Sequence, residues 1–329
     1  DPETATDIRR SFPWAQSIVA VSWAYMPEAG NPEAISGVTG RIARFATTDH
    51  YDGLRRALAA ICASLVDSGW RAEPIVDDDR LVDRAAAVRA GVGWWGKSSM
   101  VLDPRNGPWL LLGSVITDAT IPPTKPMERG CGTCTACLPA CTTGAFVSPG
   151  VLDRVRCLDH GTLRGGTNPR GLRAPLGDLV YGCDASLDVC PPGFKQMASD
   201  ERDVWRVDLL ALLGTDDETL VERYAHFYLP RRRGRSLRRN ALIALGNVVA
   251  EAIASGAIQD AEVDRIVGDL AGYLGDPDET YRIHAAWALG RIGVPAAGVL
   301  LHYQLERERS SVVASEIRAT IDEFLGATQ

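Results

Sequence analysis

Seven of the eight cysteines in this 329-residue chain fall between positions 131 and 190. The first four, Cys131, Cys134, Cys137 and Cys141, follow the spacing C-x2-C-x2-C-x3-C. Bacterial-type ferredoxin segments hold iron–sulfur clusters with this spacing, the fourth cysteine ligating the neighbouring cluster. Structural zinc sites more often use two separated pairs, and disulfide frameworks belong to small secreted domains. The run therefore predicts an iron–sulfur domain whose loop curls around a cluster.

The charge of the chain is unevenly distributed. A net charge of -7 argues against a nucleic-acid partner, yet six arginines fall within the nine residues from 231 to 239. Such a cluster can form a phosphate-binding patch on an otherwise acidic surface. The alternative is a solvated helix start, and composition alone leaves the two interpretations nearly even. The six residues are Arg231, Arg232, Arg233, Arg235, Arg238 and Arg239.

Nothing in the sequence predicts a membrane segment. No apolar run approaches the roughly 20 residues that span a bilayer, and the first ten residues lack the apolar core of a secretory signal. We therefore expect a cytoplasmic protein with no membrane partner.

The first 120 residues alternate between strand and helix patterns. Residues 17–25 and 72–76 read as strands, 49–69 and 81–90 as helices, and 109–118 as a strongly apolar segment. This order predicts an α/β layer with a sheet inside.

A glycine-rich stretch follows the second predicted helix. Gly91, Gly93 and Gly96 are spaced so that a cofactor could approach the backbone, but they match neither a Walker loop nor the dinucleotide fingerprint. A simple turn between helix and strand is the favoured interpretation from the residues alone. Lys97 is equally ambiguous, as a phosphate contact or as a solvated side chain.

Helical periodicity replaces this pattern after about residue 198, and we expect no strand from residue 201 onward. Residues 238–247 and 282–291 match at an offset of 44 residues. That period is typical of HEAT and armadillo repeats, in which helix pairs stack on their neighbours. The last third of the chain is therefore predicted to be a short α-solenoid.

Taken in order, these motifs resemble the epoxyqueuosine reductase family. The resemblance implies an α/β cobalamin-binding domain over residues 1–122, with the N-terminal segment of the family shortened. A ferredoxin-like iron–sulfur domain would follow over residues 123–198, and an all-α HEAT-like domain over residues 199–329 would grip the anticodon arm of tRNA. The matching segments are Gly40–Phe45, Asp83–Lys97, Leu112–Asp118, Cys131–Cys141, Tyr181–Asp184, Val189–Pro191 and Arg238–Asn247.

The family's reaction is the reductive removal of the epoxide oxygen of epoxyqueuosine at the tRNA wobble position, which leaves queuosine. The resemblance implies base-off cobalamin, two 4Fe-4S clusters, an external electron donor and a monomer. Asp118 matches the family's proton donor, which is required because an alkoxide leaves poorly until it is protonated; from the residues alone it is a strand-end turn residue. The implied cobalamin contacts are Arg44, Asp77, Gly91, Gly93, Trp95, Gly96, Lys97 and Ser98.

The cluster ligands depart from the family in one place. Ferredoxin logic assigns Cys131, Cys134, Cys137 and Cys190 to one cluster and Cys141, Cys157 and Cys183 to the other. The second cluster is one thiolate short because Ser186 replaces the middle thiol of the family's Cys-x2-Cys-x3-Cys-Pro motif. Ser186 could ligate as an alkoxide, the fourth iron could carry water or be missing, or the second cluster could be lost.

Residues 77–80 also depart, since Asp-Asp-Asp-Arg replaces the usual Asp-Thr-Gly-Pro. These changes leave two alternatives open. One is a divergent family member with another substrate or none. The other is a non-enzymatic nucleic-acid-binding repeat protein that keeps its clusters as structural staples.

Overall fold

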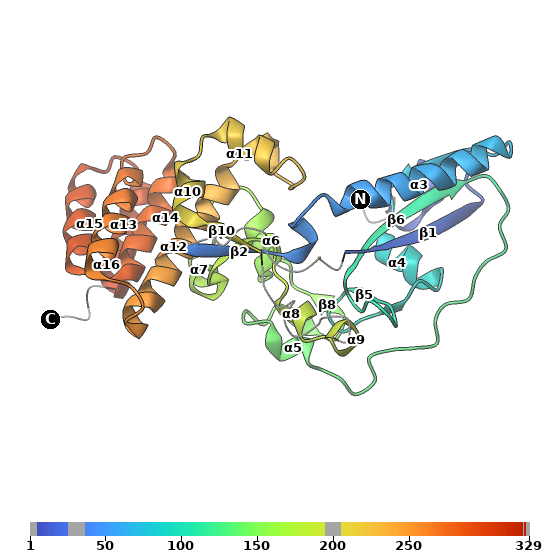
Figure 1. The fold of residues 1–329 in the computed structure, drawn as a ribbon, viewed down its shortest axis with the longest axis horizontal. Helices are drawn as coiled ribbons and strands as arrows, with labels where there is room; N and C mark the ends of the chain where they lie inside the picture. The colour runs from blue at the N-terminus through green and yellow to red at the C-terminus, as the bar shows by residue number, and fades with distance from the viewer. Residues whose placement is uncertain (1–4, 26–36, 195–204, 325, 327–329) are drawn as a thin grey trace. The chain divides into compact units, whose positions relative to one another are not determined.

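The computed structural model describes residues 5–25, 37–194, 205–324 and 326 (Figure 1). They form two compact units, each assembled from separate stretches of the chain. The first unit comprises Asp1–Gly30, Arg44–Arg154 and Asp184–Asp203, and the second Asn31–Ala43, Val155–Cys183 and Val204–Gln329. The boundaries of these two compact units differ from those of the three predicted domains, because the cysteine region contributes to both units.

An antiparallel sheet with the strand order β1-β6-β3 forms the centre of the first unit. Its strands are β1 (Ser17–Ala24), β6 (Leu110–Thr117) and β3 (Ala72–Ile75). Thr117 of β6 lies opposite Ser17 of β1 and Ala72 of β3. The structure confirms the two predicted strands, and the strongly apolar segment at 109–118 forms the third.

Helix α3 (His50–Asp67) covers one face of this sheet. It begins where the Asp49 carboxylate accepts a hydrogen bond from the backbone N–H of Asp52 at 3.1 Å, as an N-cap does. Leu54 and Leu58 are fully buried in one cluster with Val115 of β6. Each such side chain stabilises the fold by about 1.5–3 kcal/mol, which fixes this face of β6 against the helix.

The other face of the sheet packs against the N-terminal segment and α4 (Asp83–Arg89). Ile116 is buried with Phe12, Ala15 and Ile75, and α4 contacts β1 and β6. Successive residues of β6 therefore serve opposite faces, as the two-residue period of a strand requires.

Short elements complete the first unit. A hairpin of β4 and β5 precedes β6, and a second hairpin of β7 and β8 follows the first cysteines. Their bounds, with those of the short helices, are α2 (Ile8–Ser11), η1 (Arg44–Ala46), β4 (Trp94–Trp95), β5 (Val101–Leu102), α5 (Cys137–Ala140), β7 (Phe146–Ser148), β8 (Val151–Leu152), α8 (Ala185–Asp188) and α9 (Pro191–Phe194).

The second unit contains a small sheet of β10 (Arg206–Asp208), β2 (Thr39–Ile42) and β9 (Leu179–Tyr181), in that order. The expectation of no strand after residue 201 is therefore wrong at β10. Three residues are too few to produce a periodic signal, and β10 forms because its backbone pairs with the distant strand β2.

The rest of the second unit is helical (Figure 1). Helix α14 packs between α12 and α16, while α13 and α15 pack beside it. The helices are α6 (Leu158–Leu163), α7 (Arg170–Leu176), α10 (Leu209–Gly214), α11 (Asp217–Arg223), η2 (Pro230–Arg232), α12 (Arg235–Ser255), α13 (Asp260–Tyr273), α14 (Glu279–Ile292), α15 (Pro295–Arg307) and α16 (Ser311–Phe324).

The matching segments of the repeat occupy corresponding positions on α12 and α14. A Cβ added at Gly246 of α12 would lie 2.8 Å from the Cα of Ala288 on α14, and one added at Gly290 of α14 would collide with Thr320 on α16. Glycine at the same place in both segments therefore lets successive helices approach closely, which is the stacking expected of such repeats.

None of the described helices is both long enough and apolar enough to cross a membrane.

Candidate functional site

Four cysteines line one cavity in the first unit. Cys131, Cys134, Cys137 and Cys190 surround a space of about 180 Å³. Cys190 is buried, and burial, assisted by the neighbouring thiols, raises the pKa of its thiol to about 11. Iron binding here must therefore displace protons. The structure brings together the four thiols that the sequence assigned to one cluster.

The arrangement of the four cysteines suits a cluster of several metal ions better than a single ion. Among the described residues, no three His, Cys, Asp or Glu side chains converge as ligands of a single metal ion. In a 4Fe-4S cluster each thiolate binds its own iron, so the sulfurs surround a cube instead of meeting at a point. The four thiols around the cavity fit such a group.

The β4–β5 hairpin forms a wall of this cavity and explains the glycines beside it. Trp94 and Leu102 pack against Cys190. A Cβ at Gly93 would collide with the backbone oxygen of Leu102, and one at Gly96 would lie 2.9 Å from a Leu102 methyl carbon. A Cβ at Gly91 would meet the backbone oxygen of residue 125. The packing of the chain against itself therefore favours glycine at these positions.

Lys97 and Ser98 also belong to the cluster cavity, which both residues line. The ammonium of Lys97 donates to the backbone oxygen of Gly132 at 2.8 Å, inside the cysteine loop. Burial raises the pKa of the Cys137 thiol and nearby Cys131 adds to the rise, while the positive charge of Lys97 opposes both. Lys97 thus holds the loop and favours the thiolate form.

Arg44 lies inside the first unit, with 3% of its surface exposed. Its backbone N–H donates to Asp184 at 2.8 Å, and its guanidinium pairs with Asp184 and Asp188. The guanidinium also lies 5.0 Å from the centroid of a Trp109 ring. Arg44 therefore joins η1 to the segment around α8. Sequence reasoning missed the two aspartates, since only the fold brings them to Arg44.

Asp77 and Asp118 lie at opposite ends of the central sheet. Asp77 follows β3 just after Ile75, which pairs with Ser114, whereas Asp118 follows Thr117 at the far end of β6. At roughly 3.3 Å per residue, the two are on the order of 15–20 Å apart. They cannot both touch one small substrate.

The surroundings of the two aspartates also differ. The Asp118 carboxylate accepts a hydrogen bond from the backbone N–H of Arg71 at 2.8 Å, which ties the ends of two strands together. Asp77 is exposed and has a φ of 50°. This backbone conformation is energetically unfavourable for any residue other than glycine, and it is found more often at functional sites.

Asp83 is a titratable residue that the sequence did not single out as a site. Burial, together with the charges of Asp77 and Asp78, raises the pKa of its carboxyl to about 6. One of its oxygens is buried with no hydrogen-bond partner among the described residues. The run of aspartates at 77–79 was the available signal, because it places like charges next to the start of α4.

The second set of predicted ligands is divided between the units. Cys141 lies in the first unit, and Cys157 and Cys183 lie in the second. The Cys141 sulfur accepts a hydrogen bond from the backbone N–H of Ala145 at 3.3 Å. Helix α8, which carries Ser186, packs against α5, which ends next to Cys141.

The six arginines of the predicted RNA patch have three different surroundings. Arg231, Arg232 and Arg233 are exposed, whereas Arg239 has 1% of its surface exposed and binds protein oxygens. The remaining two pair with acids, Arg235 with Asp278 and Arg238 with Asp217. The prediction that Arg239 contacts RNA is therefore corrected, because helix packing encloses its side chain.

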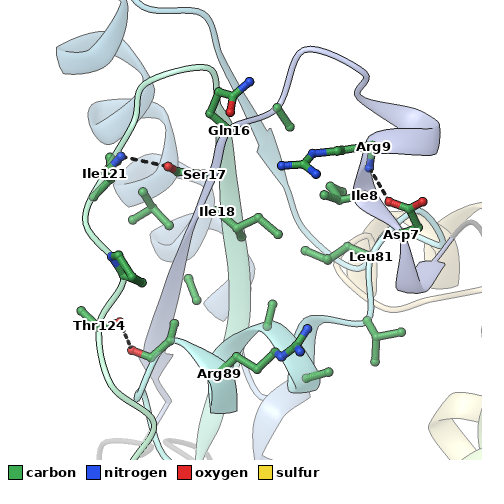
Figure 2. A pocket seen from close by; sticks show the side chains of 18 of the residues that line it. Asp7, Ile8, Arg9, Gln16, Ser17, Ile18, Leu81, Arg89, Ile121 and Thr124 are labelled. Atoms are coloured by element: carbon green, nitrogen blue, oxygen red, sulfur yellow. Dashed lines mark hydrogen bonds between the residues drawn. The ribbon is translucent and has the colours of Figure 1, made fainter.

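A larger cavity of about 730 Å³ lies beside strand β1 (Figure 2). Ile18 and Leu81 contribute apolar side chains to it, and Arg9 and Arg89 also line it. None of the residues predicted to bind cobalamin lines this cavity.

Comparisons with known proteins agree with the cluster geometry. A family described as "4Fe-4S double cluster binding domain" matches residues 130–193. Epoxyqueuosine reductase of Bacillus cereus is 33% identical over 98% of this chain and 84% of its own length, and that of Bacillus subtilis is 32% identical over 94% and 80%.

Solved structures match over nearly the whole chain. An epoxyqueuosine reductase in complex with an epoxyqueuosine-modified tRNA-Tyr stem loop matches with a TM-score of 0.85 and 31% identity, over 98% of this chain and 85% of that one. The Bacillus subtilis enzyme, with its aspartate catalytic loop swung out of the active site, matches with a TM-score of 0.84 and 30% identity, over 98% and 86%.

Proposed function

The chain belongs to the epoxyqueuosine reductase family, and on that premise we propose that it reductively removes the epoxide oxygen of epoxyqueuosine in the tRNA wobble position. The observation that carries the proposal is the cavity of four thiols in a chain that resembles a reductase bound to its modified stem loop. Two electrons and two protons convert the epoxide to an alkene and release its oxygen as water. The protein must therefore deliver electrons and hold an acid beside that oxygen.

The first cluster would be held by Cys131, Cys134, Cys137 and Cys190. The side chains of these four cysteines line one cavity. Lys97 binds the loop between the first two of them through the backbone oxygen of Gly132. A bound 4Fe-4S cluster supplies a one-electron relay to the reaction. Electrons would come from an external donor protein or reductant.

Cobalamin is proposed from the resemblance, and when bound it would supply low-valent cobalt for epoxide opening. Of the residues predicted to contact it, Lys97 and Ser98 line the cysteine cavity, and none lines the larger cavity beside β1. Arg44, Gly93 and Ser98 are buried within the protein, while Trp95 and Asp77 are exposed.

The acid is proposed to be an aspartate, with Asp118 and Asp77 as the two candidates. Asp118 is the residue that the resemblance implies, but its carboxylate is engaged with Arg71. Asp77 lies on a loop, as does the catalytic aspartate of the solved Bacillus subtilis relative. Asp77 also follows the end of β3 that lies toward the start of β6. Trp109, just before β6, packs against Gly193, which is three residues after Cys190. These contacts favour Asp77.

Single-turnover reduction of an epoxyqueuosine-containing stem loop tests this choice. Asp77→Asn should reduce the rate at least about 100-fold, the usual contribution of a positioned acid, with iron and corrinoid contents unchanged. Asp79→Asn is the matched control, because Asp79 is an exposed carboxylate of the same loop. A comparable loss in Asp118→Asn alone would return the role to Asp118, and full activity in both variants would exclude an aspartate acid at either position.

The RNA partner would meet Arg231, Arg232 and Arg233, which are exposed before α12. Replacing all three by Gln should flatten the salt dependence of stem-loop binding by about one unit of slope for each lost phosphate contact. Arg235→Gln is the control, because this arginine already pairs with Asp278. An unchanged slope in the triple variant would place the RNA elsewhere.

The second cluster is proposed to use Cys141, Cys157 and Cys183, with Ser186 at the remaining corner. The match to a double-cluster family supports two clusters. The serine at position 186, where the family has a cysteine, favours a second candidate function: a divergent reductase with another substrate. A protein with both clusters and corrinoid that leaves epoxyqueuosine unchanged would support that alternative.

A further inference from the structure

The guanidinium of Arg239 is buried in the second unit, and no carboxylate of the described residues pairs with it. Its side chain donates to the backbone oxygens of Gly161, Thr162, Arg164 and Gly166 at 2.8–3.2 Å, and to the side-chain oxygen of the adjacent Asn240. All of these acceptors are neutral. The positive charge of this arginine is therefore solvated by the protein but not neutralised by it.

The surrounding charges add to this excess. Burial, together with the positive charges of Arg164, Arg235 and Arg173, lowers the pKa of Arg239 to about 9. Arg173 pairs with Glu316 and Arg235 with Asp278. Arg164 has no acidic partner within the part of the chain that the structure describes, so two positive charges here remain uncompensated.

The contacts of Arg239 also orient the loop above it. The carbonyl groups of Arg164 and Gly166 point toward the buried guanidinium. In a trans peptide the C=O and the following N–H point in opposite directions, and the described residues contain no cis peptide bond. The N–H groups of Gly165 and Thr167 therefore point away from Arg239.

These two N–H groups lie on an open surface. Gly165, Gly166 and Thr167 are exposed, and a Cβ added at either glycine would have no heavy atom within 4 Å. Neither Gly165 nor Thr167 donates a backbone hydrogen bond to another described residue. The guanidinium of Arg164 crosses the same loop, donating to the Thr167 oxygen at 3.4 Å.

We propose that the loop from Arg164 to Thr167 is a phosphate-binding loop for the RNA backbone, and that the buried Arg239 beneath it supplies positive charge without touching the RNA. Outward N–H groups in a turn form a concave site for anions, and Arg164, which pairs with no acid of the described residues, adds a charged donor. A phosphodiester would supply the negative charge that the cluster of arginines lacks. This inference rests on the proposed function, because it names a further contact to the same RNA.

The position of the loop supports an RNA partner over a free anion. Arg239 lies one helical turn after Arg235, the first residue of α12. The exposed Arg231, Arg232 and Arg233 immediately precede that helix. The loop contacts the first turns of α12 through Arg239, and the three arginines precede the same end of that helix.

The test compares two substitutions at one open position, with the cluster-loaded full chain. Gly165→Asp places a negative charge on the loop, and Gly165→Asn adds a side chain of nearly the same size without charge. Both should fold, because the site is open and the φ of Gly165 is not in the left-handed region; equal melting temperatures check this. The probe is a fluorescently labelled tRNA anticodon stem loop, with and without epoxyqueuosine.

Gly165→Asp should bind both stem loops about tenfold more weakly than Gly165→Asn. Arg164→Gln should lower the slope of log affinity against log salt by about one. Equal affinities of the Gly165→Asp and Gly165→Asn variants, with an unchanged salt slope in Arg164→Gln, would refute phosphate binding by this loop. The proposed function would be unaffected. A wild-type protein that binds neither stem loop would overturn the proposed function and this inference with it.

Discussion

Asp83 offers a direct test of how the fold treats a carboxyl group at the start of α4. Burial raises its pKa from the ordinary value of 3.8 to about 6, assisted by the charges of Asp77 and Asp78. Because the folded pKa exceeds the unfolded one, the folded state holds this proton more tightly. Ionisation of Asp83 therefore destabilises the fold, and the loss develops as pH rises from about 4 to about 6.

The size of this effect can be bounded. At 1.36 kcal/mol for each pH unit, the rise in pKa corresponds to at most about 3 kcal/mol. The carboxyl group is only half-buried, so solvent screening reduces this to about 1–2 kcal/mol. Asp83 is also the first residue of α4, where a negative charge gains about 0.3–1 kcal/mol from the helix dipole. Burial outweighs the dipole, leaving a net cost of about 1 kcal/mol above pH 6.

Asp83→Asn should therefore raise the free energy of unfolding by about 1 kcal/mol at pH 7.5, a rise in Tm of about 2–4 °C. The advantage should shrink steadily as pH falls from 6.5 to 4.5. Thermal melts across this range measure it, with Asp79→Asn as the exposed control in the same loop. A difference that stays constant with pH, or a variant that is less stable at every pH, would refute the reasoning.

Two further predictions concern the cluster domain. Gly93→Ala should destabilise the protein by at least about 1–3 kcal/mol, because its Cβ would collide with the Leu102 backbone oxygen; melts with and without added cobalamin should show the same loss, and a loss seen only with cobalamin would restore a cofactor role. Ser186→Cys should bring the iron content to about eight per chain and give two 4Fe-4S signals in electron paramagnetic resonance spectra, whereas an unchanged spectrum and iron content would mean that residue 186 does not ligate.

The cysteine spacing and the helical repeat could be predicted from the sequence because both are local patterns. Cys131, Cys134 and Cys137 sit on one short loop, so their spacing alone places three thiols around a common centre. Gly246 and Gly290 mark the same position of two matching helices, and each allows the next helix to approach. Such features depend on neighbours in the chain, which the sequence shows directly.

The roles of the charged residues depended on packing between distant segments. Arg239 and Arg231 look alike in the arginine cluster, yet one is enclosed by the α6–α7 loop and the other is exposed. Asp77 and Asp118 both follow apolar strands, and only the register of β3 against β6 separates them along the sheet. Residue type therefore identified the candidates without distinguishing among them.

The sequence by itself determined the family, the four thiols that share one cavity and the two matching helical segments, because spacing and period are properties of the chain. The tertiary structure decided which arginines remain exposed, which glycines serve packing and at which end of the sheet each aspartate lies. Burial, register and the pairing of charges arise only when separate segments meet, so no local pattern could have supplied them.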